Sequence, residues 1–446
     1  MTNRSLLSVA GVLIACVWWP AQAQAQVPTT PKPPRATGRV SFYLTADHRR
    51  PDSSEASTGF EFATSFSLRT PEIDAAGLEA GIDMRHTGYS ATARPQRMSI
   101  YDGYVGARFG ATGQVRVRAG HMWLSDLGTA GALAGGVAEY RSKPSGATNR
   151  VVAGVFGGVE PLGYEMGYAS GVQKYGGFVA LENGYLRRHV LGFATIRNGG
   201  LTERTMLSVT NYLPVGTSFF AYQALEYDLQ GPANGAATGG LSYFLVNARA
   251  TASPRVELQG TYNRGRSVNA RQLTEDVLNG RPLTAQALDG LRYETAGGRV
   301  SLKVAKGIEI NGGYYRDRNN REDAATGRLT FGMYSSNLFG TGFDVSGSDA
   351  IIDRPSGPYH SRFVSVGRSI GRSLYASADY STSLAVLRFV RSDGVAIETR
   401  PWTRRLSGNV SATINRQFSL IGVVDYMMDE GLKDLRVMTG LTYRIR

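Results

Sequence analysis

Arg299-Val300-Ser301-Leu302-Lys303-Val304 decides the fold, because apolar and polar or charged residues alternate strictly along it. The same alternation recurs in residues 40–44, 406–412 and 435–438. Successive side chains of a β-strand point to opposite faces, so each of these segments has one apolar face and one polar face. Many such strands without a helical core need an apolar solvent against their apolar faces. The pattern therefore predicts a closed β-barrel that spans a lipid bilayer.

Strand segments follow one another along the rest of the chain, and the sequence predicts an all-β fold of 18–22 strands, with 22 the best count. The fold is expected to be one antiparallel up-and-down barrel over residues 39–446. The predicted strands are 39–47, 58–70, 78–86, 98–109, 114–123, 136–142, 149–158, 174–183, 187–197, 202–213, 218–229, 239–251, 255–265, 293–304, 308–317, 327–337, 342–349, 360–369, 373–384, 402–414, 417–428 and 433–446.

The connections between these strands alternate in length, which supports the count independently. Every second connection is a short turn rich in Gly, Pro and Asn, the residues that tight reversals require. The short turns include 110–113, 214–217, 253–254, 306–307, 371–372 and 415–417, and the longer polar loops include 48–57, 87–97, 159–173, 318–326, 350–359 and 385–401. Short periplasmic turns and long external loops are typical of bacterial outer-membrane barrels.

The first 25 residues are predicted to be a secretory signal peptide, followed by a Pro-rich linker over 26–38. Small residues allow cleavage after Ala23 or Ala25. A competing interpretation is a bacterial lipoprotein signal that would leave Cys16 as a lipid-modified N-terminus. Cys16 is the only cysteine, so an ordinary cleavage leaves none and excludes disulfides and thiolate metal sites. The expected location is the bacterial outer membrane.

The strand pattern and the aromatic residues near strand ends resemble bacterial outer-membrane porins and related channels. The aromatic residues in question are Tyr314, Tyr315, Phe331, Tyr334, Trp402, Tyr426 and Tyr443. The final segment, residues 438–446, resembles the terminal strand of these proteins but ends on Arg446, where they commonly end on an aromatic residue. The resemblance implies outer-membrane lipid and the barrel-assembly machinery as partners.

The chain carries a formal charge of +13, and 43 of its 49 basic residues are Arg. Runs of Lys and Arg are missing, which argues against nucleic acid as a partner. Charges are costly against lipid, so those on strands are predicted to face inward. The predicted lumen-lining residues are Arg39, Glu79, Asp83, Arg85, Asp102, Arg108, Arg116, Arg118, Arg299, Lys303, Glu309, Arg328, Arg436 and Arg444. They either form a cation-biased path for anionic or sugar-like solutes, or pair with one another and hold the wall together.

Residues 267–292 form the largest insertion. Residues 269–278 favour a short helix stopped by Gly280, and Thr284 can cap a second turn that ends at Gly290. Two interpretations stay open for this insertion. It either folds into the lumen as a constriction or caps the barrel from outside.

Signals for catalysis are weak. The five histidines are scattered without metal-ligand spacing, and the nearest local pair is His121 with Asp126. Gly131–Gly136 is rich in glycine but lacks the Lys-Ser or Lys-Thr of a phosphate-binding loop. We therefore expect no enzyme, no cofactor and no metal site.

The sequence favours a porin-like outer-membrane channel for small anionic or sugar-like solutes. Two alternatives stay open: an outer-membrane exporter of exopolysaccharide, and a structural or adhesive barrel without transport. A barrel of 22 strands without a filling element would be leaky. Either the insertion at 267–292 occludes it, or the strand number is 18 or 20.

Overall fold

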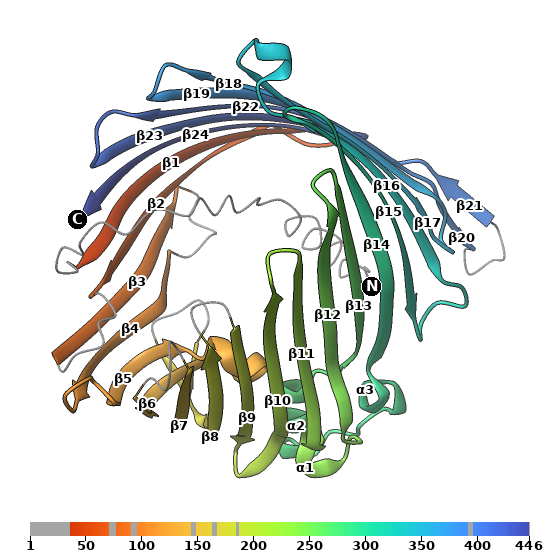
Figure 1. Ribbon diagram of the computed structural model, residues 1–446. Helices are drawn as coiled ribbons and strands as arrows, with labels where there is room; N and C mark the ends of the chain where they lie inside the picture. Colours follow the sequence, from red (N-terminus) through yellow and green to blue (C-terminus); the bar gives the residue numbers. More distant parts are fainter. Residues whose placement is uncertain are drawn as a thin grey trace. The chain divides into compact units, whose positions relative to one another are not determined.

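The first and last strands of the computed structural model pair with each other, β1 (Thr37–Pro51) with β24 (Leu432–Ile445), and this pairing closes the sheet into a barrel (Figure 1). The structure describes residues 36–70, 77–90, 96–143, 149–162, 167–183, 187–390 and 396–445. The predicted signal peptide, Cys16 and the linker up to residue 35 lie outside the described residues. Ala36–Arg446 forms one unit.

The described residues build a sheet of 22 strands, each antiparallel to its neighbours, which confirms the predicted fold and its best count. Between β1 and β24, the barrel strands are β2 (Ser57–Arg69), β3 (Gly77–Tyr89), β4 (Arg97–Phe109), β5 (Val115–Trp123), β6 (Ala132–Arg141), β7 (Asn149–Pro161), β8 (Tyr168–Asn183), β9 (Arg187–Asn198), β10 (Leu201–Val215), β11 (Phe219–Gln230), β12 (Gly240–Ser253), β13 (Val256–Ser267), β14 (Leu291–Ala305), β15 (Ile308–Asn319), β16 (Thr326–Ser335), β17 (Phe343–Asp353), β18 (Tyr359–Ile370), β19 (Leu374–Ala385), β22 (Trp402–Thr413) and β23 (Phe418–Asp429).

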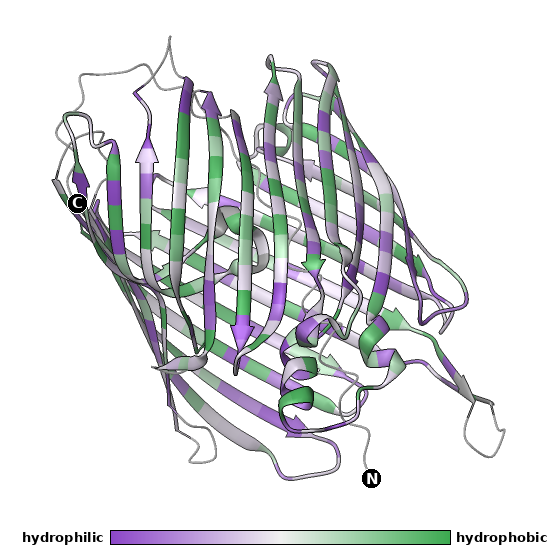
Figure 2. Ribbon diagram, turned by 90° about the horizontal axis from the view of Figure 1, so that it is seen from below, coloured by the Kyte–Doolittle hydropathy of each residue, from purple (hydrophilic) through white to green (hydrophobic). Residues whose placement is uncertain are grey.

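The two faces of the sheet differ in the way that the alternation predicts. In the deciding stretch on β14, Val300 and Leu302 are 43% and 39% exposed, whereas Ser301 between them is 4% exposed. Figure 2 shows apolar and polar residues alternating along most strands. Leu44, Val105 and Leu406 lie on the same outward face and are exposed. Such a continuous apolar exterior is stable only against lipid, so the barrel is transmembrane.

The two ends of the barrel differ, and we name them the turn end and the loop end. The turn end holds the start of β1, the end of β24 and tight turns such as Lys306-Gly307 and Gly371-Arg372, with Gly307 and Gly371 at φ +76° and +65°. The loop end joins β1 to β2 and carries most of the irregular segments. One of these, residues 385–401, was predicted as a plain loop. It contains an additional hairpin of β20 (Leu387–Val390) and β21 (Ala396–Thr399).

The insertion at 267–292 forms the two predicted helices, α2 (Ala270–Leu278) and α3 (Ala285–Asp289). The side chain of Asn269 accepts a hydrogen bond from the Gln272 N–H and caps α2, and Thr284 caps α3 in the same way. With α1 (Pro232–Gly235) they form a small apolar cluster centred on Leu273.

These three helices lie at the loop-end rim, beside the ends of β9 to β13 (Figures 1 and 2). Of the two interpretations of the insertion, this position agrees with the external cap. None of the helices in the described part of the chain is long and apolar enough to cross a bilayer.

Candidate functional site

The candidate site is the inward face of the barrel, where pairing and exposure place all fourteen residues of the predicted set. Strand partners share a face, and Arg39 lies opposite Arg444 on the face of the buried Ser41. On the far wall, Lys303 of β14 lies opposite Glu309 of β15. These side chains are not grouped in one place, however. The structure divides them into a paired set and an unpaired set.

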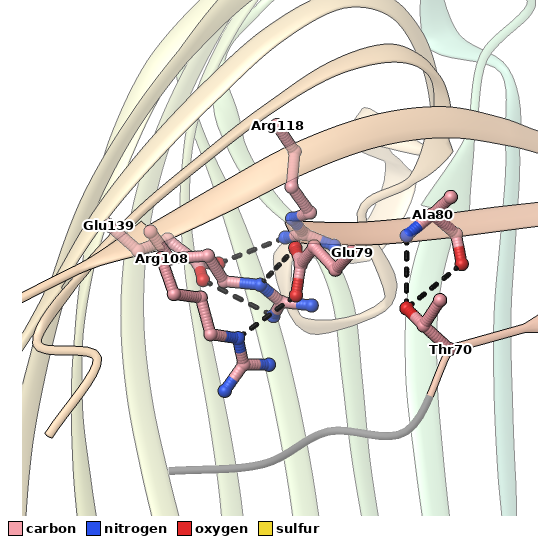
Figure 3. A network of polar contacts seen from close by, with 7 residues as sticks. Thr70, Glu79, Ala80, Arg108, Arg118 and Glu139 are labelled. Carbon is pink, nitrogen blue, oxygen red and sulfur yellow. Dashed lines mark hydrogen bonds and ion pairs between the residues drawn. The ribbon is translucent and has the colours of Figure 1, made fainter. Parts of the chain in front are cut away.

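The paired set lies on β3 to β6 and is drawn in Figure 3. Arg108 and Arg116 donate from Nε to the two carboxylate oxygens of Glu79, at 2.9 and 2.6 Å. Arg116 and Arg118 both reach Glu139, at 3.5 and 3.0 Å. Glu79, Arg108 and Arg116 are each no more than 6% exposed. Buried charges are stable only when paired and hydrogen-bonded, so this network holds the wall together.

Two further predicted residues of this wall also have partners. Asp102 accepts a hydrogen bond from Arg69 at 2.9 Å, and Arg85 lies 3.5 Å from Glu61. Asp83 lies opposite Asp102 across the β3–β4 pairing. On this part of the barrel the pairing interpretation of the inward charges therefore describes the contacts better than the open-path interpretation.

The unpaired set lies on β14 to β16 and on β24 and β1. No ion pair between described residues involves Arg39, Arg299, Lys303, Arg328, Arg436 or Arg444. Arg328 lies instead over the ring of Tyr315, with its guanidinium carbon 4.6 Å from the ring centre. Arg39 and Lys303 are exposed. Unpaired cations that line a cleft raise the local concentration of anions.

A short segment that the sequence analysis did not single out lies inside the ring of strands. It is η1 (Ser125–Ala130), which joins β5 to β6 at the loop end and turns inward (Figures 1 and 2). Leu127 is 2% exposed and packs beside Gly192 of β9, and Gly128 lies beside the carboxylate of Glu226 on β11. A side chain at either glycine would collide with its neighbour, since an ideal Cβ there lies 2.5 and 2.1 Å from those atoms. η1 therefore crosses from β5 and β6 to the inner face of β9 to β11.

An apolar cluster lies beneath η1 on the inward face of β5 to β10. Its members are Met122, Leu124, Leu127, Ala130, Leu133, Val137, Val152, Phe156, Phe178, Ala180, Val190, Ala194 and Met206. The expected polar inner face is thus replaced on this wall by a packed core. The area removed from water stabilises η1 inside the barrel at about 25 cal/mol per Å² of apolar surface.

Lys174 of β8 fixes one end of η1. Its ammonium group donates to the carbonyl oxygens of Ala130 and Ala132, at 2.8 and 3.2 Å, and lies 2.9 Å from the carboxylate of Glu160. Three donors on a compact ammonium suit this arrangement better than the planar fork of Arg would. Lys174 is 5% exposed, so these contacts are made away from bulk water.

Glu160 connects Lys174 to helix α2 at the loop-end rim. Arg271 of α2 donates to Glu160 at 3.0 Å and to Glu203 of β10 at 2.6 Å. Burial alone would lower the pKa of Arg271, but its hydrogen bonds and charge attraction to Glu203 and Glu160 raise that pKa above the ordinary value. Arg271 therefore stays charged, and an unbroken series of polar contacts joins α2 to η1.

A second ion-pair network borders η1 on the next strands. Arg204 of β10 lies 3.0 Å from Glu226 and 2.5 Å from Asp228, and donates to the Ser242 hydroxyl at 2.6 Å. This wall carries two carboxylates around one guanidinium. Within the part of the chain that the structure describes, no His, Cys, Asp or Glu side chains gather in threes to hold a metal ion.

Of the comparisons with known proteins, only the one with solved structures finds similar chains. No family model matches the sequence, and a search of curated proteins finds no match. OccAB1 of Acinetobacter baumannii is 9% identical, with a TM-score of 0.44 over 92% of this chain and 97% of that chain. OccK7 (OpdD) of Pseudomonas aeruginosa is 10% identical, with a TM-score of 0.42 over 92% and 99%. The P pilus usher (PapC) translocation pore is 11% identical, with a TM-score of 0.47 over 92% and 100%.

The fold and its inner face define the class of this chain. It is a closed transmembrane β-barrel of 22 antiparallel strands, with a folded segment held against one inner wall. The wall that η1 covers is apolar and ion-paired, and the wall of β14 to β16 presents unpaired cations.

Proposed function

We propose that this chain is a bacterial outer-membrane channel for the passive passage of small anionic or sugar-like solutes, with its loop end outside and a cleaved signal peptide. The observation that carries the proposal is that the charges of the two inner walls are paired differently. The arginines of β4 and β5 are bound to Glu79 and Glu139, whereas Arg299, Lys303 and Arg328 have no carboxylate partner among the described residues. Unpaired cations beside a path attract anions and oppose cations.

η1 gives this channel its constriction. In favour of η1 over the insertion at 267–292 is its position, because Leu127 and Gly128 contact the inner face of β9 and β11 whereas α2 and α3 lie at the loop-end rim. A lumen narrowed in this way favours small solutes over a polymer chain. The proposal therefore ranks the passage of small solutes above the export of exopolysaccharide.

Reconstitution into planar bilayers tests the proposal. The wild type should conduct, with a reversal potential in a salt gradient that indicates anion preference. Replacing Arg299 and Lys303 by Gln should lower that preference while the barrel still assembles, because lumen substitutions tune selectivity more than stability. Conduction with cation preference would contradict the assignment of the path to this wall.

A variant with a shortened η1 tests the constriction and the non-transport alternative together. Replacing residues 125–130 by a Gly-Ser turn should raise conductance several-fold. If neither the wild type nor this variant conducts, a structural or adhesive role is supported and the channel is excluded.

A further inference from the structure

The outward face of β13 to β1 changes character toward the loop end. At the turn end the described outward strand positions are apolar except for Arg368, and the exposed basic residues there, Arg255, Lys306, Arg372 and Arg416, lie in the turns between strands. At the loop end, the same strands carry basic side chains that are exposed. These residues, the basic band, are Arg264, Arg316, Arg318, Arg362, Arg404, Lys433 and Arg50.

Strand register shows that part of the basic band is one continuous row. Arg362 lies opposite Thr382, Thr382 opposite Arg404, and Arg404 opposite Met428. Met428 then lies opposite Lys433, and Lys433 opposite Arg50. Neighbouring strands are about 4.8 Å apart, so successive cations along the row are separated by one or two strand spacings.

These residues lie on the outward face and not on the lumen side. Arg362 shares its face with Val364 and Val366, which are 49% and 39% exposed, and Arg404 shares its face with Leu406 at 55%. The side chain of Arg362 is itself 64% exposed. A charged side chain next to this apolar surface is stable where the hydrocarbon ends and lipid headgroups begin.

The charge of the band remains positive after its acidic neighbours are counted. Asp349 lies 3.2 Å from Arg362 and 2.6 Å from His360, and Glu294 and Asp353 share the outward face near the same end. Three carboxylates thus face seven cations. No ion pair between described residues involves Arg404, Lys433 or Arg50, and Arg404 lies over the Trp402 ring, 5.1 Å from its centre.

We propose that the basic band binds the phosphate groups of anionic lipids in the leaflet at the loop end, with Arg404, Lys433 and Arg50 as its centre. Guanidinium forks suit phosphate oxygens, and an ammonium adds a further point charge. Trp402 beside Arg404 provides the amphipathic ring that is typical of the membrane interface. The described residues of β2 to β8 form no such row of basic side chains on the outward face. The lipid is therefore bound on one side of the barrel.

Native mass spectrometry of the detergent-purified barrel is carried out with lipid A, a glycolipid with two phosphates, and with the same glycolipid after its phosphates are removed. The double variant Arg404→Gln with Lys433→Gln should bind lipid A about 25-fold more weakly, since each basic residue near an anionic surface contributes about fivefold. Bilayer conductance should stay at the wild-type value.

The control variant removes the same number of charges from the inward face, as Arg299→Gln with Lys303→Gln, and should keep wild-type lipid binding. An equal loss in both variants, or equal binding of the dephosphorylated glycolipid, would overturn the proposal. Inorganic phosphate alone separates the two sources of the ligand. If it displaces lipid A completely at low concentration, the band is a site for soluble anions and not for a lipid.

Discussion

The ammonium nitrogen of Lys174 lies 2.8 Å from the carbonyl oxygen of Ala130, and this contact holds a segment inside the barrel to its wall. Lys174→Met should loosen η1, because the last residue of η1 loses a charged donor that stabilises by about 1.5–3 kcal/mol. We expect larger single-channel conductance and more open-channel noise. Lys303→Met on β14, outside the contacts of η1, removes the same charge and should leave the noise unchanged. An identical trace for Lys174→Met and wild type would show that the apolar cluster alone positions η1.

Glu79 joins Arg108 and Arg116, so its removal should act on stability. Glu79→Gln removes the negative charge that Arg108 and Arg116 share, and breaking a buried ion pair typically costs about 3–5 kcal/mol. We expect a lower urea midpoint for unfolding, measured by the gel shift between folded and unfolded barrel. Glu309→Gln, on the inward face but without an ion pair in the described structure, should change the midpoint little. If both variants unfold alike, the network is weaker than its burial indicates.

The faces of β14 can be tested directly. Val300→Arg places a charge against lipid and should cost about 2–4 kcal/mol if the residue lies near the bilayer midplane. Ser301→Arg places the same charge on the inward face and should assemble more efficiently. The measurement is the fraction of heat-modifiable protein in the outer-membrane fraction. Equal assembly of the two variants would mean that the register is wrong.

The β20–β21 hairpin carries a carboxylate with a shifted pKa. Hydrogen bonds from Arg400 and Arg388 hold the pKa of Glu398 below its usual range. Because the folded pKa is depressed, the contacts of Glu398 are fully present above the ordinary glutamate pKa and are lost as pH falls through the lowered value. NMR titration should show this, and Arg400→Gln should move the midpoint upward. An unchanged midpoint in that variant would exclude Arg400 as the main cause.

Residues 299–304 show why so much of the fold follows from sequence. Alternation is a local signal. Because apolar side chains of a transmembrane strand face lipid and polar ones face inward, the number of strands and the face of each residue could be predicted from it. The caps Asn269 and Thr284 are equally local, and the helices they start were predicted correctly.

The sequence predicts which charged residues face inward, but it does not give which of them pair, because those contacts join side chains of different strands. Two interpretations stayed open for Arg116, beside a solute path or paired within the wall, because no local pattern gives its side-chain contacts with Glu79 and Glu139. η1 was missed because its six residues have no helical periodicity. A signal did exist: residues 151–159 and 176–181 are apolar on both faces, which indicates strands covered on both sides.

The division of the inner face has a consequence for what the barrel distinguishes. One wall is apolar and its charges are ion-paired, whereas the wall of β14 to β16 holds Arg299, Lys303 and Arg328, for which the described residues provide no ion pair. In the proposed channel, a solute between them would experience an electric field directed across its path as well as along it. Molecules with a charged end and an uncharged end would be turned sideways during passage. Two solutes of equal size and equal charge would then pass at different rates if their charge is placed differently.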